Sequence, residues 1–327
     1  MAKIIGNLTP EDDFTHELGP EPNFNESMYF NFFDSKRSIG GFLRIGNRAN
    51  EGYAETTVTL FLPDGRVLFN FKRARIDNND AFDAGGTKFE VIEAAQKLRT
   101  TYSGSVCALS EPHEMTNPRD AFTNNPFLKV EIDLVHDAVG PLYGSSKNKA
   151  ESERSAEDQF AKAHYEQHMR VTGNVEIEGE RLEIDGYGLR DHSWGPRHWQ
   201  AIDSYEWLTM NFGDDLGAMV SIIRTEPDKA RVHGVIVRGD ELETIREAEI
   251  EADYEDNGLF HTSVRARITT ASGEKHEIEG KVRNFIPLRN RREGLTTHIG
   301  EGMTEWRWGD RNGYGLSEFL RQVRSEA

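Results

Sequence analysis

The sequence lacks most of the features that mark common binding and catalytic sites. It has a single cysteine, Cys107, among 327 residues, which excludes a disulfide within the chain and a cysteine-rich metal site. It contains no dinucleotide fingerprint, no phosphate loop and no serine elbow of the α/β-hydrolase type. No stretch approaches the roughly 20 apolar residues of a membrane helix, and the first residues form no apolar run of signal-peptide length. We therefore expect a cytoplasmic protein with no integral membrane segment.

Basic residues are also under-represented relative to acidic ones. The chain has 39 lysines and arginines against 56 acidic residues, a formal charge of −17. Because a phosphate backbone would repel such a chain, we expect no nucleic-acid partner. The 36% of hydrophobic residues, with 10% aromatics, is enough for a sizeable core. At this length two domains, or one large β domain, are expected.

The dominant pattern in the sequence is alternation with a period of two. In Phe127 to Val135, apolar residues alternate with charged ones, as in an antiparallel strand with one solvated face. Tyr53 to Leu62 alternates in the same way and leads into Pro63-Asp64-Gly65, a hairpin turn. Further hairpin turns are predicted at Glu178-Gly179-Glu180, Gly213-Asp214-Asp215, Arg238-Gly239-Asp240 and Ala271-Ser272-Gly273.

These patterns predict an all-β, mainly antiparallel fold, because no sustained alternation of strands and helices appears. Residues 141–153 have the composition of a linker. A short linking helix is predicted from Ser155 to about His164, and a C-terminal helix from about Leu316 to Arg324. We expect two tandem β-barrel or sandwich domains, residues 1–150 and 151–327.

Residues 186–199, Gly-Tyr-Gly-Leu-Arg-Asp-His-Ser-Trp-Gly-Pro-Arg-His-Trp, are the densest group of unusual residues. On a regular strand, Arg190, His192 and Trp194 lie on the face of two apolar residues that precede them and therefore point inward. Gly186 and Gly188 either leave open space beside them or allow another group to approach closely. Together these residues predict an aromatic cavity with a few convergent polar groups, typical of a small-molecule site.

Two interpretations of His192 fit the pattern. It is a general acid or base held by a carboxylate, Asp191, Asp203 or Glu206, or it is a core histidine that ties two strands together. The histidine and aspartate spacing matches no closed zinc pattern, so we expect no metal and no other cofactor. The candidate catalytic residues are His192, Asp191 and Trp194, and the candidate substrate-binding residues are Tyr187, Arg190, Trp199, Tyr205, Glu206, Trp207 and Met219.

The segment Arg190-Asp191-His192-Ser193-Trp194-Gly195 resembles the Asp-His-Asn/Ser-Trp-Gly motif of the carotenoid 1,2-hydratase (hydroxyneurosporene synthase) and AttH-like superfamily. Residues 301–306 and 313–318 resemble a bacterial branch of that group. The resemblance implies two lipocalin-like β domains in tandem. It also implies hydration of terpenoid double bonds or, as in fungal relatives, pericyclic cyclisation of polyenes.

By the same resemblance, the motif histidine and tryptophan, which are implicated in protonating an alkene and holding the cation, correspond to His192 and Trp194. The hydratases also have a Tyr-x-Asp on a later strand. Met219 to Ile222, the strand that would align with it, has neither residue.

The leading hypothesis is a cofactor-independent enzyme, a hydro-lyase or an isomerase or cyclase, that acts on a lipophilic terpenoid- or polyketide-like molecule. The alternative is a non-catalytic, lipocalin-like carrier of an apolar ligand. A third interpretation makes the motif a joint between two domains. The expected partner is a hydrophobic small molecule, and a homo-oligomer is left open.

Overall fold

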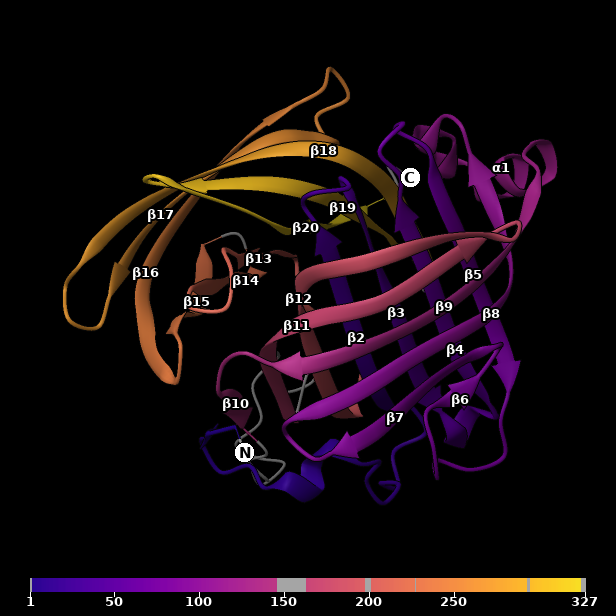
Figure 1. Ribbon diagram of the computed structural model, residues 1–327, viewed down its shortest axis with the longest axis horizontal. Helices are drawn as coiled ribbons and strands as arrows, with labels where there is room; N and C mark the ends of the chain where they lie inside the picture. Colours follow the sequence, from indigo (N-terminus) through magenta and orange to yellow (C-terminus); the bar gives the residue numbers. More distant parts are fainter. Residues whose placement is uncertain (1, 146–162, 198–200, 227, 293–294, 325–327) are drawn as a thin grey trace. The chain divides into compact units, whose positions relative to one another are not determined.

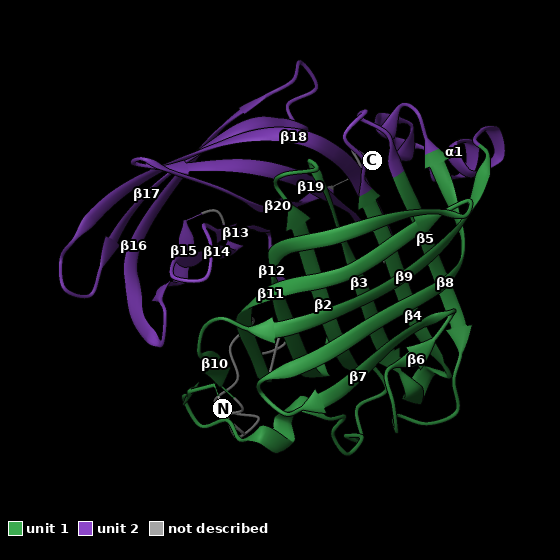
Figure 2. Ribbon diagram, in the orientation of Figure 1, with its two compact units in different colours: residues 1–60, 68–108, 126–198 green, residues 61–67, 109–125, 199–327 purple. Residues whose placement is uncertain are grey.

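The structure, a computed structural model, describes residues 2–145, 163–197, 201–226, 228–292 and 295–324. The chain folds into two compact units (Figure 2). Unit 1 comprises Met1–Leu60, Leu68–Ala108 and Pro126–His198. Unit 2 comprises Phe61–Val67, Leu109–Asn125 and Trp199–Ala327. Strands dominate both units, so the all-β prediction is confirmed.

Unit 1 is built on one large sheet (Figure 1). In it, β11, β12, β2, β3, β4, β5, β8 and β9 follow one another around a path that closes where β9 pairs with β11. Its elements are β1 (Ile4–Ile5), η1 (Pro10–Asp13), β2 (Phe24–Asp34), β3 (Ile39–Arg48), η2 (Ala49–Glu51), β4 (Tyr53–Phe61), β5 (Val67–Arg75), β6 (Asp83–Ala84), β7 (Thr87–Glu93), β8 (Lys97–Leu109), β9 (Phe127–Ala138), β10 (Leu142–Ser145), β11 (Ala163–Ile177) and β12 (Glu180–Pro196).

Unit 2 is a closed antiparallel barrel in which the strands from β13 to β20 pair in sequence order and β20 returns to β13. Its strands are β13 (Ser204–Asn211), β14 (Gly217–Glu226), β15 (Lys229–Arg238), β16 (Glu241–Tyr254), β17 (His261–Thr270), β18 (Lys275–Arg292), β19 (Leu295–Trp308) and β20 (Arg311–Arg324). Two short helices, η3 (Pro112–Thr116) and α1 (Pro118–Asn124), belong to this unit.

The hairpin turns lie where the sequence predicts them. The turns join β4 to β5, β11 to β12, β13 to β14, β15 to β16 and β17 to β18. Each has a glycine with positive φ, a conformation that costs other residues about 1 kcal/mol or more. These glycines are Gly65, Gly179, Gly213, Gly239 and Gly273. Local sequence therefore determines these reversals.

The expected boundary near residue 150 does not match the two units. β11 and β12 pair with β9 and β2, and together they complete the sheet of unit 1. The segment 186–197 therefore belongs to unit 1 and not to the second unit. The reason is backbone pairing across a long sequence separation, which no local pattern reveals.

The predicted linking helix lies almost wholly outside the described residues, and its last residue, His164, is part of β11. The predicted C-terminal helix is wrong, because Leu316 to Arg324 belongs to β20. This strand pairs with β13 on one side and β19 on the other. A helix there would leave both neighbours with unpaired backbone groups.

The interior of the unit 2 barrel is an apolar cluster. It contains Leu208, Met210, Phe212, Ala218, Val220, Ile236, Ile245, Val264, Ala266, Ile268, Ile278, Trp306 and Phe319.

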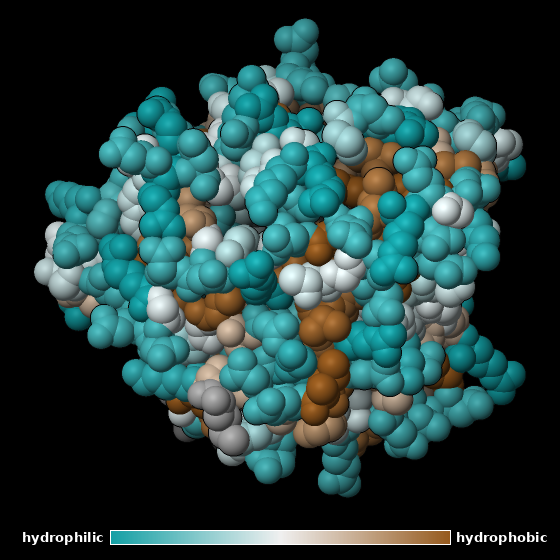
Figure 3. Space-filling view, in the orientation of Figure 1, coloured by the Kyte–Doolittle hydropathy of each residue, from teal (hydrophilic) through white to brown (hydrophobic). Residues whose placement is uncertain are grey.

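On the molecular face drawn in Figure 3, hydrophilic side chains cover most of the surface and hydrophobic ones form smaller groups. No helix in the described part of the chain is long and apolar enough to cross a bilayer.

Candidate functional site

Strand β12 places three motif side chains on one face. In the ladder with β11, Arg190 is opposite Gln167 and His192 is opposite Tyr165. On its other side, β12 pairs with β2, where Trp194 is opposite Glu26. The prediction that Arg190, His192 and Trp194 share a face is confirmed by the contacts described below.

The strand can approach β2 closely because residue 188 is glycine. A Cβ atom at Gly188 would lie 1.9 Å from the carbonyl oxygen of Asn31. Of the two roles expected for the glycines, close approach is therefore the correct one at this position. The side chains of Arg190 and His192 are fully buried, so the interior around them is packed and not an open cavity.

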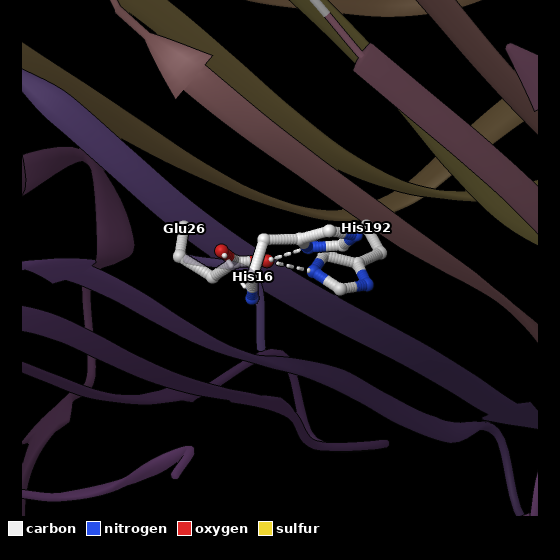
Figure 4. Close-up of side chains that lie close together, drawn as sticks. All are labelled: His16, Glu26 and His192. Carbon is white, nitrogen blue, oxygen red and sulfur yellow. Dashed lines mark hydrogen bonds and ion pairs between the residues drawn. The ribbon is translucent and has the colours of Figure 1, made fainter. Parts of the chain in front are cut away.

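His192 is held between a carboxylate and a phenol. Its Nε2 lies 2.6 Å from Oε1 of Glu26, and its Nδ1 lies 3.1 Å from the Tyr165 hydroxyl. The same Glu26 oxygen accepts a hydrogen bond from Nδ1 of His16 at 2.8 Å. Figure 4 shows both imidazole rings directed at this one oxygen. Nε2 of His16 continues the chain to Oδ1 of Asp12 at 3.2 Å.

The members of this hydrogen-bonded chain differ in their access to solvent. The side chains of Glu26 and His192 are 0% exposed, whereas that of His16 is 22% exposed. His16 also stacks on the indole ring of Trp194, with ring centroids 3.9 Å apart and planes 12° apart. The hydrogen-bonded chain therefore runs from the surface, through His16 and Glu26, to the buried His192.

Arg190 is fixed by a second carboxylate. Its Nη1 donates to Oδ1 of Asp13 at 2.6 Å, and its Nε and Nη2 donate to Oε1 of Gln167 at 2.9 and 2.7 Å. Nη1 also donates to the Tyr165 hydroxyl at 3.1 Å, and that hydroxyl donates to Asp13. Tyr165 thus connects the Arg190 pair to His192.

These contacts shift the ionisation of both carboxylates in the same direction. Burial acts to raise the pKa of Glu26, but hydrogen bonds from His16 and His192 lower it to about 2. Burial likewise acts to raise the pKa of Asp13, and the Arg190 charge and hydrogen bond lower it. Both groups are therefore carboxylates at neutral pH.

The hydrogen bonds of the Tyr165 hydroxyl bear on which ring nitrogens of His192 act as donors. Because the Tyr165 hydroxyl gives its hydrogen to Asp13, its oxygen can only accept from Nδ1 of His192. Nε2 of His192 faces the ionised Glu26 and also donates. With a hydrogen on both ring nitrogens, His192 would donate to Glu26 and to Tyr165 at once.

Within the residues that the structure describes, two groups of side chains could hold a metal ion. The first is His16, Glu26 and His192, whose donor atoms lie within 4.8 Å of one another. There both imidazoles contact a single carboxylate oxygen, so the group forms a hydrogen-bonded chain. The second group is His164, Glu166 and Asp191, on the other face of β12.

The sequence also matches a family model over residues 9–323, described as "Domain of unknown function (DUF7064)". The chain belongs to the DUF7064 family. No curated protein matches this DUF7064 chain.

Several solved structures share its fold. One is an AttH candidate from Nitrosomonas europaea, with TM-score 0.64, 16% identity, and coverage of 99% of this chain and 100% of that one. Kievitone hydratase from Nectria haematococca gives a TM-score of 0.57 at 13% identity, over 98% of this chain and 96% of the hydratase. CghA, in its structure with Sch210972, gives 0.57 at 12% identity, over 93% and 89%. At these identities the likeness concerns the fold alone.

The expected carboxylate partners of His192 are wrong in this DUF7064 chain. Asp191 points to the opposite face of β12, where it forms an ion pair with His164. Glu206 belongs to unit 2 and pairs with Arg224, and Asp203 belongs to the same unit. The carboxylate that contacts His192 is that of Glu26.

The other candidates are distributed over both units. Tyr187 lies on the Asp191 face of β12, and the Arg170 guanidinium lies 6.0 Å from its ring centroid. Trp199 lies outside the described residues. The candidates in unit 2 are Tyr205, Glu206 and Trp207 on β13 and Met219 on β14. Their assignment to substrate binding stays a prediction.

Sequence reasoning missed Glu26, His16, Asp13 and Tyr165. One of them left a signal: in Phe24–Asp34, Glu26 occupies a period-two position among phenylalanine and methionine residues, and an acidic residue on an apolar face needs a partner. His16 lies between η1 and β2, where no periodicity identifies an inward side chain.

Proposed function

We propose that this chain is an enzyme that transfers a proton to or from a lipophilic small molecule, without a cofactor, and that His192 is the group that moves the proton. The observation that carries the proposal is the fully buried pair of His192 and Glu26, whose atoms lie 2.6 Å apart. Of the three interpretations of the motif, this one accounts for the paired charges.

A structural role would not need such a pair. Removing two charges from water costs several kcal/mol for each ion, and apolar residues of similar volume often pack at least as well. Here the buried pair also connects to the surface through His16. Groups with buried, coupled charges are concentrated at catalytic sites. The arrangement therefore supports catalysis by a protonated His192.

The stacking of His16 on Trp194 supports a position for the substrate. A planar unsaturated group has the same shape as the His16 ring, which lies 3.9 Å from the indole. When His16 moves out, such a group can take its place beside Glu26 and His192. The face of Trp194 would then stabilise a developing carbocation.

The chemistry balances for addition of water to a double bond. The π electron pair of the alkene forms a C–H bond with the His192 proton, and a water oxygen bonds to the resulting cation. Water then returns one proton to the neutral imidazole, so one water is consumed and His192 is regenerated. The reverse sequence eliminates water. If a second double bond of the substrate attacks the cation instead, a ring closes, and the new cation loses a proton to the neutral imidazole, which regenerates His192.

Two structural neighbours support this class of reaction, because one is named kievitone hydratase and another, CghA, was solved with Sch210972. A terpenoid or polyketide-like substrate would suit a site lined by Trp194 and Phe82, whose ring lies 5.4 Å from that of His192. The absence of Tyr-x-Asp on the strand from Met219 argues against carotenoid hydration itself.

The test is a panel of lipophilic alkenes, polyenes and tertiary alcohols incubated with the protein in ¹⁸O-labelled water. We expect one panel member to gain a hydroxyl that contains ¹⁸O, to lose its own hydroxyl as water, or to cyclise. His192→Gln and Glu26→Gln should each lower turnover by about 100-fold or more. The matched control is His113→Gln, a partly exposed histidine of unit 2, which should retain full turnover.

Binding measured on the same variants separates the alternatives. If His192→Gln loses turnover but still binds a product analogue, the result supports the interpretation as an enzyme. A ligand that the native protein binds but never converts would support the carrier instead. Equal turnover in the native protein and His192→Gln would exclude the assigned role of His192.

A further inference from the structure

A second cluster of ionisable side chains lies on the face of β12 opposite His192. Asp191 on β12 is directly opposite Glu166 on β11, and His164 lies two residues before Glu166 on the same face. Tyr143 on β10 is opposite Glu166 on its other side. Three adjacent strands of unit 1 therefore bring four polar side chains to one patch.

The geometry of the patch is that of a ligand set. The donor atoms of His164, Glu166 and Asp191 all lie within 4.8 Å of one another. Nε2 of His164 lies 3.6 Å from Oε1 of Glu166 and forms an ion pair with Asp191. The side chains of His164 and Asp191 are 39% and 20% exposed, whereas that of Glu166 is 2% exposed. The patch is thus anchored in the protein and has an entry path from solvent.

Tyr143 supplies an independent observation. Its side chain is buried, and its hydroxyl has no hydrogen-bond partner within the described part of the chain. A buried hydroxyl beside two carboxylates, with no bond of its own, indicates that a further atom belongs in the patch.

We propose that His164, Glu166 and Asp191 bind a divalent transition-metal ion of the Zn²⁺ type. One imidazole and two carboxylates form a donor set that suits Zn²⁺ better than Mg²⁺ or Ca²⁺. Ligand bonds of about 2.0–2.2 Å place donor atoms roughly 3–3.5 Å apart, so the three side chains need only small movements. The charge of the ion matches that of the two carboxylates.

The bound ion would join β11 to β12 beside the catalytic strand. Because Asp191 precedes His192, a ligand bond to Asp191 would restrain the backbone that positions the His192 ring. The site does not depend on the proposed reaction, and its test needs no substrate.

The test measures Zn²⁺ binding directly. Full-length protein is dialysed against a chelator, titrated with Zn²⁺ by calorimetry and analysed for bound metal after gel filtration. Native protein should bind about one Zn²⁺ per chain, and Co²⁺ in its place should give the visible absorption of a low-coordinate site. Mg²⁺ should not compete at millimolar concentration.

Variants assign the ion to its ligands. His164→Ala and the more conservative Asp191→Asn should each weaken Zn²⁺ binding by at least about 10-fold. Circular dichroism confirms that each variant is folded. Glu26→Gln is the matched control, because it removes a carboxylate from the other candidate group and should bind Zn²⁺ as the native protein does.

Three results would overturn the proposal. In the first, the native protein binds no Zn²⁺ at a tenfold molar excess. In the second, folded His164→Ala and Asp191→Asn bind Zn²⁺ with unchanged affinity. In the third, Glu26→Gln loses Zn²⁺ binding and His164→Ala keeps it. The last result would place the ion among His16, Glu26 and His192.

Discussion

His136 gives unit 1 a sensitivity to acid that can be calculated from its surroundings. The side chain is fully buried on β9, where Nε2 lies 2.9 Å from the Thr100 hydroxyl and the ring lies 4.6 Å from that of Phe30. Burial, together with the nearby Arg190 charge, lowers the pKa of His136 from 6.5 to about 3. The folded protein therefore keeps this imidazole neutral at a pH where the unfolded chain protonates it.

The sign and magnitude follow from linkage. As the pH falls below about 6.5, the unfolded state binds a proton that the folded state does not, so the stability falls. Each pH unit between the two pKa values costs about 1.4 kcal/mol. Near pH 4.5 the His136 contribution is therefore a loss of about 3 kcal/mol, and above pH 7 it vanishes.

The perturbation that tests this is His136→Gln, which removes the titrating group and keeps a polar side chain for Thr100. Denaturant unfolding, followed by fluorescence, gives the free energy of unfolding near neutral pH and near pH 4.5. We expect the loss of stability between these pH values to be about 3 kcal/mol smaller in His136→Gln than in the native protein. The control is His233→Gln, an exposed histidine of unit 2, which should leave the native pH dependence unchanged. Equal pH dependence in the native protein and His136→Gln would refute the reasoning.

Three further predictions concern packing and charge. Asp13→Asn should destabilise unit 1 by about 3–5 kcal/mol, because it leaves Arg190 buried without its counter-ion; chemical denaturation measures the change. Gly188→Ala should cost about 1–3 kcal/mol, because its Cβ would lie 1.9 Å from the Asn31 carbonyl oxygen; a lowered thermal midpoint would show it, and an unchanged one would contradict the close approach. Trp306→Ala should cost about 3–5 kcal/mol by emptying the centre of the unit 2 barrel, and calorimetry should show the unit 2 transition shifting while that of unit 1 stays.

The sequence alone predicted the strands of alternating residues and the hairpin turns. Alternation with a period of two identified strands, and glycine-containing turns identified hairpins, because both depend on neighbouring residues. The same rule placed Arg190, His192 and Trp194 on one face of one strand, which β12 confirms. The all-β class follows from these patterns. The C-terminal helix was wrong because β20 is stabilised by two neighbouring strands, a tertiary effect that outweighs local preference.

Only the tertiary structure decided which residues meet. Glu26 reaches His192 across 166 positions of sequence, through the pairing of β2 with β12. Because of this pairing and that of β9 with β11, the motif belongs to unit 1, and the two units differ from the expected domains. Asp191, the residue next to His192, faces the other way because adjacent side chains of a strand point to opposite sides. Periodicity defines the face on which a residue lies, but its partner depends on strand register, which is a property of the folded chain.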